Sequence, residues 1–312
     1  MKKNLYISLS ILGILIVVYF FIALIFSNFD LKMVFGKDER TLDSIDYEVN
    51  VSELNINVSS DNIVLKKSDD NNVHIKYYKS NKKTFETSFN DGLLTINQTK
   101  PWYVMFSFSR NYSIEISLPN TELNSVSIKV SSGNINIDMD IMISNLSIRT
   151  SSGNISLEGN TTNNTNINVS SGKINLKDFK SNELDIKASS GKINANNIEV
   201  GKVKFNISSG NINLEGGTIN FLEIDTSSGN VKSTKLSLGS ANIDTSSGDV
   251  NLGIKVLYTS IYKMDLETSS GDILITGGGY NISTKGYLVT GDGNQLIKVD
   301  VSSGDIKINF EN

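Results

Sequence analysis

The sequence predicts an all-β fold: a single-stacked, β-helix-like solenoid with rungs of about 19 residues, preceded by one N-terminal transmembrane helix. Three observations support this prediction. The tripeptide Ser-Ser-Gly occurs nine times, and the first seven copies are 19 or 20 residues apart. Apolar residues alternate with polar ones on both sides of each copy, which is the pattern of half-buried strands. A run of 22 uncharged residues begins at Leu5.

The uncharged run, residues 5–26, is long enough to cross a membrane. At about 1.5 Å per residue a helix of this length spans roughly 33 Å, against about 30 Å for the hydrocarbon core. A cleaved signal peptide has a shorter apolar core and small residues at the cleavage site, whereas Ile25, Phe26 and Ser27 make a poor site. We therefore expect residues 1–29 to be an uncleaved anchor, with a cleaved signal as the alternative.

The orientation of this anchor is inferred from the composition of the chain beyond it. Lysines flank the run on both sides, so the positive-inside rule does not decide. The remainder of the chain is rich in Ser, Thr and Asn and has no cysteine. We expect a single-pass protein of the cell membrane with an extracytoplasmic solenoid, joined to the anchor by a linker over residues 30–46.

Residues 47–119 carry the repeat pattern in a degraded form and are predicted to be irregular rungs that cap the stack. Ser59-Ser60-Asp61, for example, stands where a regular copy would have Ser-Ser-Gly. A solenoid needs atypical end units because its terminal strand edges are otherwise open. The aromatic stretch at residues 102–108 is expected to be a buried or capping strand, with contact to a membrane or a partner as the alternative.

Residues 120–312 are predicted to form the regular solenoid, with insertions near residues 253–265 and 277–296. If each repeat glycine is position zero, positions −7, −5, −3, +2 and +4 are mostly apolar. The step from −3 to +2 is odd, so the tripeptide is a corner where glycine supplies a positive φ and the serine hydroxyls satisfy backbone groups. The nine predicted corners are Gly133, Gly153, Gly172, Gly191, Gly210, Gly229, Gly248, Gly271 and Gly304.

Composition removes several classes of function. The absence of cysteine excludes disulfides, thiolate zinc sites and a cysteine nucleophile. A single histidine, His74, argues against a catalytic triad or a multi-histidine metal site and is predicted to be a surface residue. The net charge of −4 argues against nucleic acid as a partner. We predict no cofactor and no catalytic residues.

Two outward positions change charge along the chain. Position +1 is Asn or Lys in the earlier repeats and Asp at Asp249, Asp272 and Asp305, and position −4 changes in the same direction. One interpretation is a cation site formed by these three aspartates, since carboxylates are hard ligands for Ca²⁺. The alternative is a solvated, screened face. Asparagines at position +3 are expected to form a hydrogen-bonding ladder, with presentation of their amides to a polysaccharide as the alternative.

The repeats also resemble a known family. A strand that ends at Leu118-Pro119, the nine repeats, and a closing Val-Ser-Ser-Gly-Asp-Ile segment at residues 301–306 are similar to a bacterial family of β-strand-repeat envelope proteins. That family is labelled "putative adhesin" and is also classed as a domain of unknown function. The resemblance covers roughly residues 47–312, implies the fold and an envelope location, and supplies no catalytic residues.

We therefore expect a non-catalytic, membrane-anchored envelope protein whose repetitive surface serves adhesion or ligand binding. Its partners would be the membrane, through residues 5–26, and an envelope glycan, a cationic peptide or a membrane protein. The first alternative is an envelope-stress component that senses or sequesters cationic antimicrobial agents. The second is a polysaccharide-active β-helix enzyme with carboxylates on neighbouring rungs.

Overall fold

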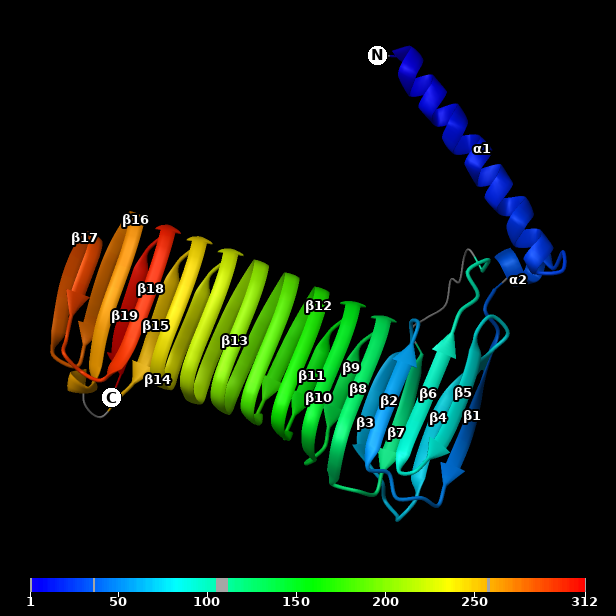
Figure 1. The fold of residues 1–312 in the computed structure, drawn as a ribbon, viewed down its shortest axis with the longest axis horizontal. Coiled ribbons are helices and arrows are strands. Elements are labelled where there is room, and N and C mark those ends of the chain that lie inside the picture. The colour runs from blue at the N-terminus through cyan, green and yellow to red at the C-terminus, as the bar shows by residue number, and fades with distance from the viewer. Residues whose placement is uncertain (1, 36, 105–111, 257–258, 312) are drawn as a thin grey trace.

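The computed structural model describes residues 2–35, 37–104, 112–256 and 259–311. Helix is concentrated in a long N-terminal segment, and the rest of the described chain is a stack of strands that joins into one 19-stranded sheet. Figure 1 shows the stack from the side, with the long helix projecting from the end at which the first strands lie. The fold is the β-solenoid that the repeats predict.

The apolar run forms α1 (Lys2–Phe26), and a short helix, α2 (Leu31–Phe35), comes after it. Within α1, Ser8–Phe26 has a mean hydropathy of 3.0, and only 6% of its most apolar window is buried by the rest of the protein. Its length and composition therefore fit a membrane span. The ring of Phe26 lies 5.1 Å from that of Trp102, which is half-exposed. Residues 101–104 form no strand, contrary to the expectation for 102–108, of which 105–108 lie outside the described residues.

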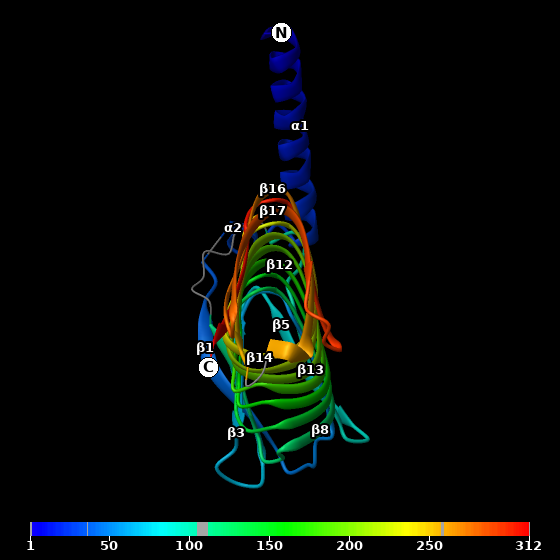
Figure 2. The same cartoon turned by 90° about the vertical axis from the view of Figure 1, so that its left-hand side faces the viewer.

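The regular part of the stack consists of parallel strands in register. Consecutive rungs pair residue for residue, so that Ile148 has Ile128 on one side and Ile167 on the other. Seen along the stack in Figure 2, each rung is a flattened loop with two long sides. The strands are β8 (Glu122–Ser132), β9 (Ile135–Asp138), β10 (Met142–Ser152), β11 (Ile155–Glu158), β12 (Thr161–Lys177), β13 (Lys180–Ser228), β14 (Val231–Ser247) and β15 (Val250–Lys255).

The N-terminal strands close the end of the stack nearest the helix. β2 and β3 form a rung that pairs with β8 and β9, and β6 and β7 stack on its outer side. Antiparallel strands then finish this end: β5 on β6, β4 on β7, and β1 on β4. The strands are β1 (Arg40–Tyr47), β2 (Glu53–Val58), β3 (Asn62–Lys67), β4 (Val73–Ser80), β5 (Thr84–Asn90), β6 (Leu93–Thr99) and β7 (Ser113–Leu118). The segment expected as a linker, residues 30–46, thus contains α2 and most of β1.

The C-terminal rungs do not stack in chain order. After a 3-10 turn, η1 (Thr259–Ile261), the last strands are β16 (Tyr262–Gly277), β17 (Tyr280–Thr290), β18 (Gln295–Ser303) and β19 (Ile306–Glu311). β18 pairs with β14 on one side and β16 on the other, so the Gly304 rung lies between the Gly248 and Gly271 rungs. β17 runs antiparallel along β16 and closes this end. The chain skips one rung position and returns to fill it.

The core is one continuous apolar column inside the loops. It runs from Val51 in the first rung to Phe310 in the last strand and includes the apolar residues at positions −7, −5, +2 and +4 of the repeats. Position −3 is buried as well, for example at Thr150 and Ile207. The predicted alternation and its change of parity at each corner are therefore confirmed, because two consecutive exposed serines separate the two inward series.

Candidate functional site: the corner ridge

The nine Ser-Ser-Gly corners stack into a ridge along the solenoid, which we call the corner ridge. Seven of the nine glycines have positive φ, between 129° and 153°, whereas Gly133 and Gly271 do not. Close approach is what all nine share. A Cβ on any of them would lie less than 3.0 Å from the carbonyl oxygen of the corner residue in the neighbouring rung. Glycine is thus required mainly by contact between rungs, with φ as an additional requirement at most corners.

At most corners the backbone N–H of position +1 donates to the position +1 side chain of the neighbouring rung, not to a serine hydroxyl as predicted. The side-chain oxygen of Asn154 accepts a hydrogen bond from the backbone N–H of Lys173 at 3.0 Å, and that of Asn230 accepts from Asp249 at 2.9 Å. Within the described residues, no hydrogen bond is found for the hydroxyls of the corner serines at 151, 170 and 189 (the first serine of each copy). These hydroxyls therefore face solvent along the ridge.

The three predicted cation ligands are neighbours, but in the order Asp249, Asp305, Asp272. The carboxylate of Asp249 accepts a hydrogen bond from the backbone N–H of Asp305, and the carboxylate of Asp305 accepts one from the backbone N–H of Asp272, each at 3.0 Å. The hydrogen bond from Asp272, aided by Lys307 at 3.2 Å, lowers the pKa of Asp305 below its usual range. In the part of the chain described, no three His, Cys, Asp or Glu side chains are grouped to hold a metal ion. The cation site stays a prediction, and the same aspartates have a structural role.

Position −4 forms a second column beside the serines, and its charge divides the ridge in two. Nearest the helix it is basic and neutral, and beyond the middle it is acidic in four consecutive rungs. No ion pair involves any of these four acids within the described residues. In spatial order the column reads Lys129, Arg149, Asn168, Lys187, Asn206, Asp225, Asp244, Asp300 and Glu267.

A groove of about 330 Å³ lies along the basic half of this column. Its lining includes Arg149, Asn168 and Lys187 together with the exposed serines of the same rungs. Lys187 is 3.7 Å from the carboxylate of Asp185, whereas Arg149 is in no ion pair with any described residue. None of the lining residues, all of which are described, is aromatic. The groove therefore offers cations, hydroxyls and amides, a chemistry suited to a polar anion.

The asparagine ladder predicted at position +3 is confirmed over three rungs. Asn194 donates to the side-chain oxygen of Asn175 at 3.0 Å, and Asn213 donates to that of Asn194 at 3.1 Å. The ladder does not extend to Asn136 or Asn251, because Ser156 and Lys232 occupy the rungs between. It stabilises the stack rather than presenting free amides.

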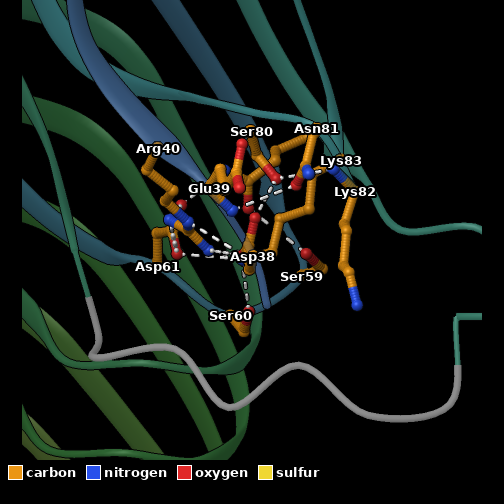
Figure 3. A network of polar contacts seen from close by, with 11 residues as sticks. Asp38, Glu39, Arg40, Ser59, Ser60, Asp61, Ser80, Asn81, Lys82 and Lys83 are labelled. Atoms are coloured by element: carbon orange, nitrogen blue, oxygen red, sulfur yellow. Dashed lines mark hydrogen bonds and ion pairs between the residues drawn. The ribbon is translucent and has the colours of Figure 1, made fainter. Parts of the chain in front are cut away.

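A buried ionic network fixes the segment after α2 to the first rung (Figure 3). Nη1 of Arg40 is 2.9 Å from both carboxylate oxygens of Asp61, and the Arg40 guanidinium also pairs with Asp38 at 2.9 Å. Nζ of Lys83 lies 2.9 Å from the carboxylate of Asp61, and the side-chain amide of Gln98 donates a hydrogen bond to the same carboxylate at 2.6 Å. The charged side chains are at most 2% exposed, so removal of one would leave others buried without compensation.

Burial and hydrogen bonding act in opposite directions within this network. Burial alone would raise the pKa of Asp38, but hydrogen bonds from Ser80 and Arg40 hold that pKa below its ordinary value. Burial lowers the pKa of Lys83, against the attraction of Asp61. Sequence reasoning missed the network because its members are far apart in the chain. The only signal was Asp61, which stands in the first rung where a corner glycine is expected.

His74, predicted to be a surface residue, is partly exposed and lies between two carboxylates. Its Nδ1 is 2.7 Å from Asp46 on β1, and its Nε2 is 2.9 Å from Asp70. Hydrogen bonds to Asp46 and then Asp70 raise the pKa of His74 above its ordinary value. This arrangement adds a pH-dependent contact to the antiparallel strands of the N-terminal cap.

The parallel rungs, the stacked corners and the antiparallel caps define a β-solenoid protein with an N-terminal apolar helix. The Toastrack DUF4097 family model matches residues 51–159 and 138–309, well over half of the chain. The chain belongs to this Toastrack family, which confirms the resemblance drawn from its repeats.

Solved structures with a similar arrangement share little sequence with this chain. A "putative adhesin" from Bacteroides fragilis is 15% identical with a TM-score of 0.48, over 88% of this chain and 99% of its own. A "putative adhesin" from Parabacteroides distasonis is 15% identical with a TM-score of 0.45, over 87% and 98%. A "putative lipid binding protein" from the same species is 16% identical with a TM-score of 0.37, over 88% and 99%. No curated protein matches the chain.

Proposed function

We propose that this protein is a non-catalytic component of the cell envelope, held in the membrane by α1, whose solenoid binds ligands outside the membrane along the corner ridge. The observation that carries the proposal is the ridge itself: stacked serine hydroxyls without partners among the described residues, flanked by charged columns. Regular stacking does not require these charges, since asparagine occupies the same positions in other rungs. A repetitive, exposed and charged ridge is typical of an extended binding surface.

Two features support the anchoring part of the proposal. α1 is apolar along a length that fits a bilayer, and its last turn contacts the half-exposed ring of Trp102, an amphipathic residue favoured at membrane interfaces. The buried network of Arg40 and Asp61 then holds the chain that leaves the helix against the first rung. Such an attachment would keep the solenoid close to the membrane surface instead of on a loose tether.

Cysteine labelling of intact cells tests the location. The chain has no cysteine, so Asn281→Cys on the exposed edge strand β17 and Lys3→Cys before the apolar run each report one position. With a membrane-impermeant thiol reagent we expect Asn281→Cys to label in intact cells and Lys3→Cys only after lysis. The labelled chain should keep its full-length mass. Labelling of Asn281→Cys only after lysis would overturn the proposal, and a shortened chain would indicate a cleaved signal.

The acidic half of the −4 column favours a second function, the sequestration of cationic agents. Asp225, Asp244 and Asp300 lie in adjacent rungs, with Glu267 next to them, and like charges so placed repel one another. A cationic peptide would relieve that repulsion. Salt-sensitive peptide binding that is lost when the first three are changed to Asn would favour this function. Release of reducing ends from envelope glycan would instead favour the enzymatic alternative.

A further inference from the structure

We propose that the basic half of the corner ridge binds a linear phosphate polymer of the envelope, laid parallel to the solenoid axis. This inference rests on the proposed function, because it names the ligand class of the same ridge. The site is the groove beside β10, β12 and the first part of β13, which is lined by Arg149 and Lys187. Lys129 on β8 lies next to Arg149 in the same column and extends the basic surface beyond the groove. Figure 1 shows these strands in the half of the solenoid nearer the helix.

Two cations of the basic half have no acidic partner within the described residues. Several lysines elsewhere on the solenoid sides pair with acids on neighbouring rungs, for example Lys177 with Glu158, and Lys180 with Glu199 at 2.9 Å. In the ridge, neither Lys129 nor Arg149 is in an ion pair with any described residue. The stack can therefore neutralise its lysines across rungs, and it does not do so here.

The +1 column places further cations on the other side of the serines. Lys173 and Lys192 are direct neighbours in this column, and neither side chain is in an ion pair with a described residue. Lys129 and Arg149 are likewise neighbours at position −4. Adjacent like charges on a sheet are unfavourable by a few tenths to about 1 kcal/mol per pair. A bound polyanion would convert these repulsions into attractions.

The spacing suits a polymer better than a single small anion. Neighbouring rungs are about 4.8 Å apart, so the column from Lys129 to Lys187 extends over about 14 Å. Charges distributed over that length engage one chain at several points, and each released counterion adds to affinity. Arg149 can bind a phosphate group through two parallel N–H donors. The serine hydroxyls of the same rungs can donate to the remaining phosphate or hydroxyl oxygens.

The polarity of the groove argues against nucleic acid as the polymer. Single-stranded nucleic acids bind through aromatic platforms on which the bases stack, and this groove has no aromatic lining. A polymer of alternating polyol and phosphate groups needs only cations and hydrogen-bonding partners, which the groove supplies. The acidic half of the ridge would repel such a chain, so binding should be confined to the rungs from Lys129 to Asn206.

The test uses the full-length protein in non-ionic micelles with poly(glycerol phosphate) as the probe. The triple variant Lys129→Gln, Arg149→Gln and Lys187→Gln should weaken binding at least about tenfold and flatten the dependence of log K on log salt by about 2. The matched control, Lys66→Gln, Lys177→Gln and Lys180→Gln, removes the same charge from paired lysines on other faces. It should change affinity by no more than about twofold.

A gain of affinity separates the proposal from a folding defect. Asn168→Lys fills the neutral rung between Arg149 and Lys187 and should tighten binding several-fold with an increased salt dependence. Equal losses in the two triple variants, or no binding of the polymer to the wild-type chain, would overturn the proposal. So would binding of oligothymidine as tight as that of poly(glycerol phosphate) and lost in the same variant. Because cell labelling is a separate measurement, a wrong location and a wrong ligand would be distinguished.

Discussion

The substitution Gly191→Ala tests whether close contact between rungs is what requires glycine at the corners. An alanine Cβ at this position would lie less than 3.0 Å from the carbonyl oxygen of Gly172, which is backbone and has no rotamer to change. The φ of Gly191, 148°, is also unfavourable for alanine. Strain of about 1–3 kcal/mol, together with two weakened ladder hydrogen bonds at about 1 kcal/mol each, gives a loss of about 3–5 kcal/mol.

Gly216→Ala provides the control for this loss. Gly216 also has a positive φ, 64°, but nothing lies within 4 Å of the position that its Cβ would take. It should therefore lose only about 1–2 kcal/mol from backbone strain. Urea unfolding of the full-length chain in non-ionic micelles, monitored by far-UV circular dichroism, compares the midpoints. If Gly191→Ala is no more destabilising than Gly216→Ala, the contact argument is wrong and glycine serves only the backbone conformation.

Three further predictions concern the ridge and the N-terminal cap. Asn230→Ala removes the acceptor for the backbone N–H of Asp249 and should lower stability by about 0.5–1.5 kcal/mol in urea unfolding. Asn230→Asp keeps an acceptor and, at high salt, where its repulsion from Asp249 is screened, should lose less; equal losses there would contradict this role. Arg40→Met leaves the buried carboxylate of Asp61 short of a partner and should cost about 3–5 kcal/mol, with partial recovery when Asp61→Asn is added; no recovery would contradict the ionic account. His74 should titrate by NMR above the ordinary value of about 6.5. Because the pKa of His74 is raised in the folded state, its contribution to stability is fully present below the ordinary pKa and is lost as pH rises through the folded pKa. A titration at or below the ordinary pKa would contradict the contacts with its two aspartate neighbours.

The repeat period was sufficient to predict the rung, its inward positions and its corner, because every rung solves the same packing problem. It was not sufficient to predict the order of rungs. All rungs present the same faces to their neighbours, so the Gly304 rung fits between Gly248 and Gly271 as well as it would fit at the end. The long segment after Gly271 permits this, since β17 returns along β16 before the last rung begins. Chain order alone carries no information about that choice.

The candidate site was only partly predictable for a related reason. The acidic columns were visible in the sequence, but their continuity at position −4 became clear only when the Asp300 rung was placed beside Asp244. The basic groove was overlooked because a lysine in a repeat does not reveal whether an acid on the next rung is near enough to pair. The network of Arg40 and Asp61 has no periodic signature, because it joins a non-repeating strand to the first corner.

The charges of the corner ridge are not a requirement of the stack. Position −4 tolerates Asn168 and Asn206 in regular rungs of the same solenoid, with the same register and the same buried neighbours at −5 and −3. Charged residues there place like charges about 4.8 Å apart in successive rungs, at a small cost for every pair. The register of the stack therefore does not depend on a charged residue at position −4. We propose that a ligand of opposite charge along the ridge offsets this repulsion.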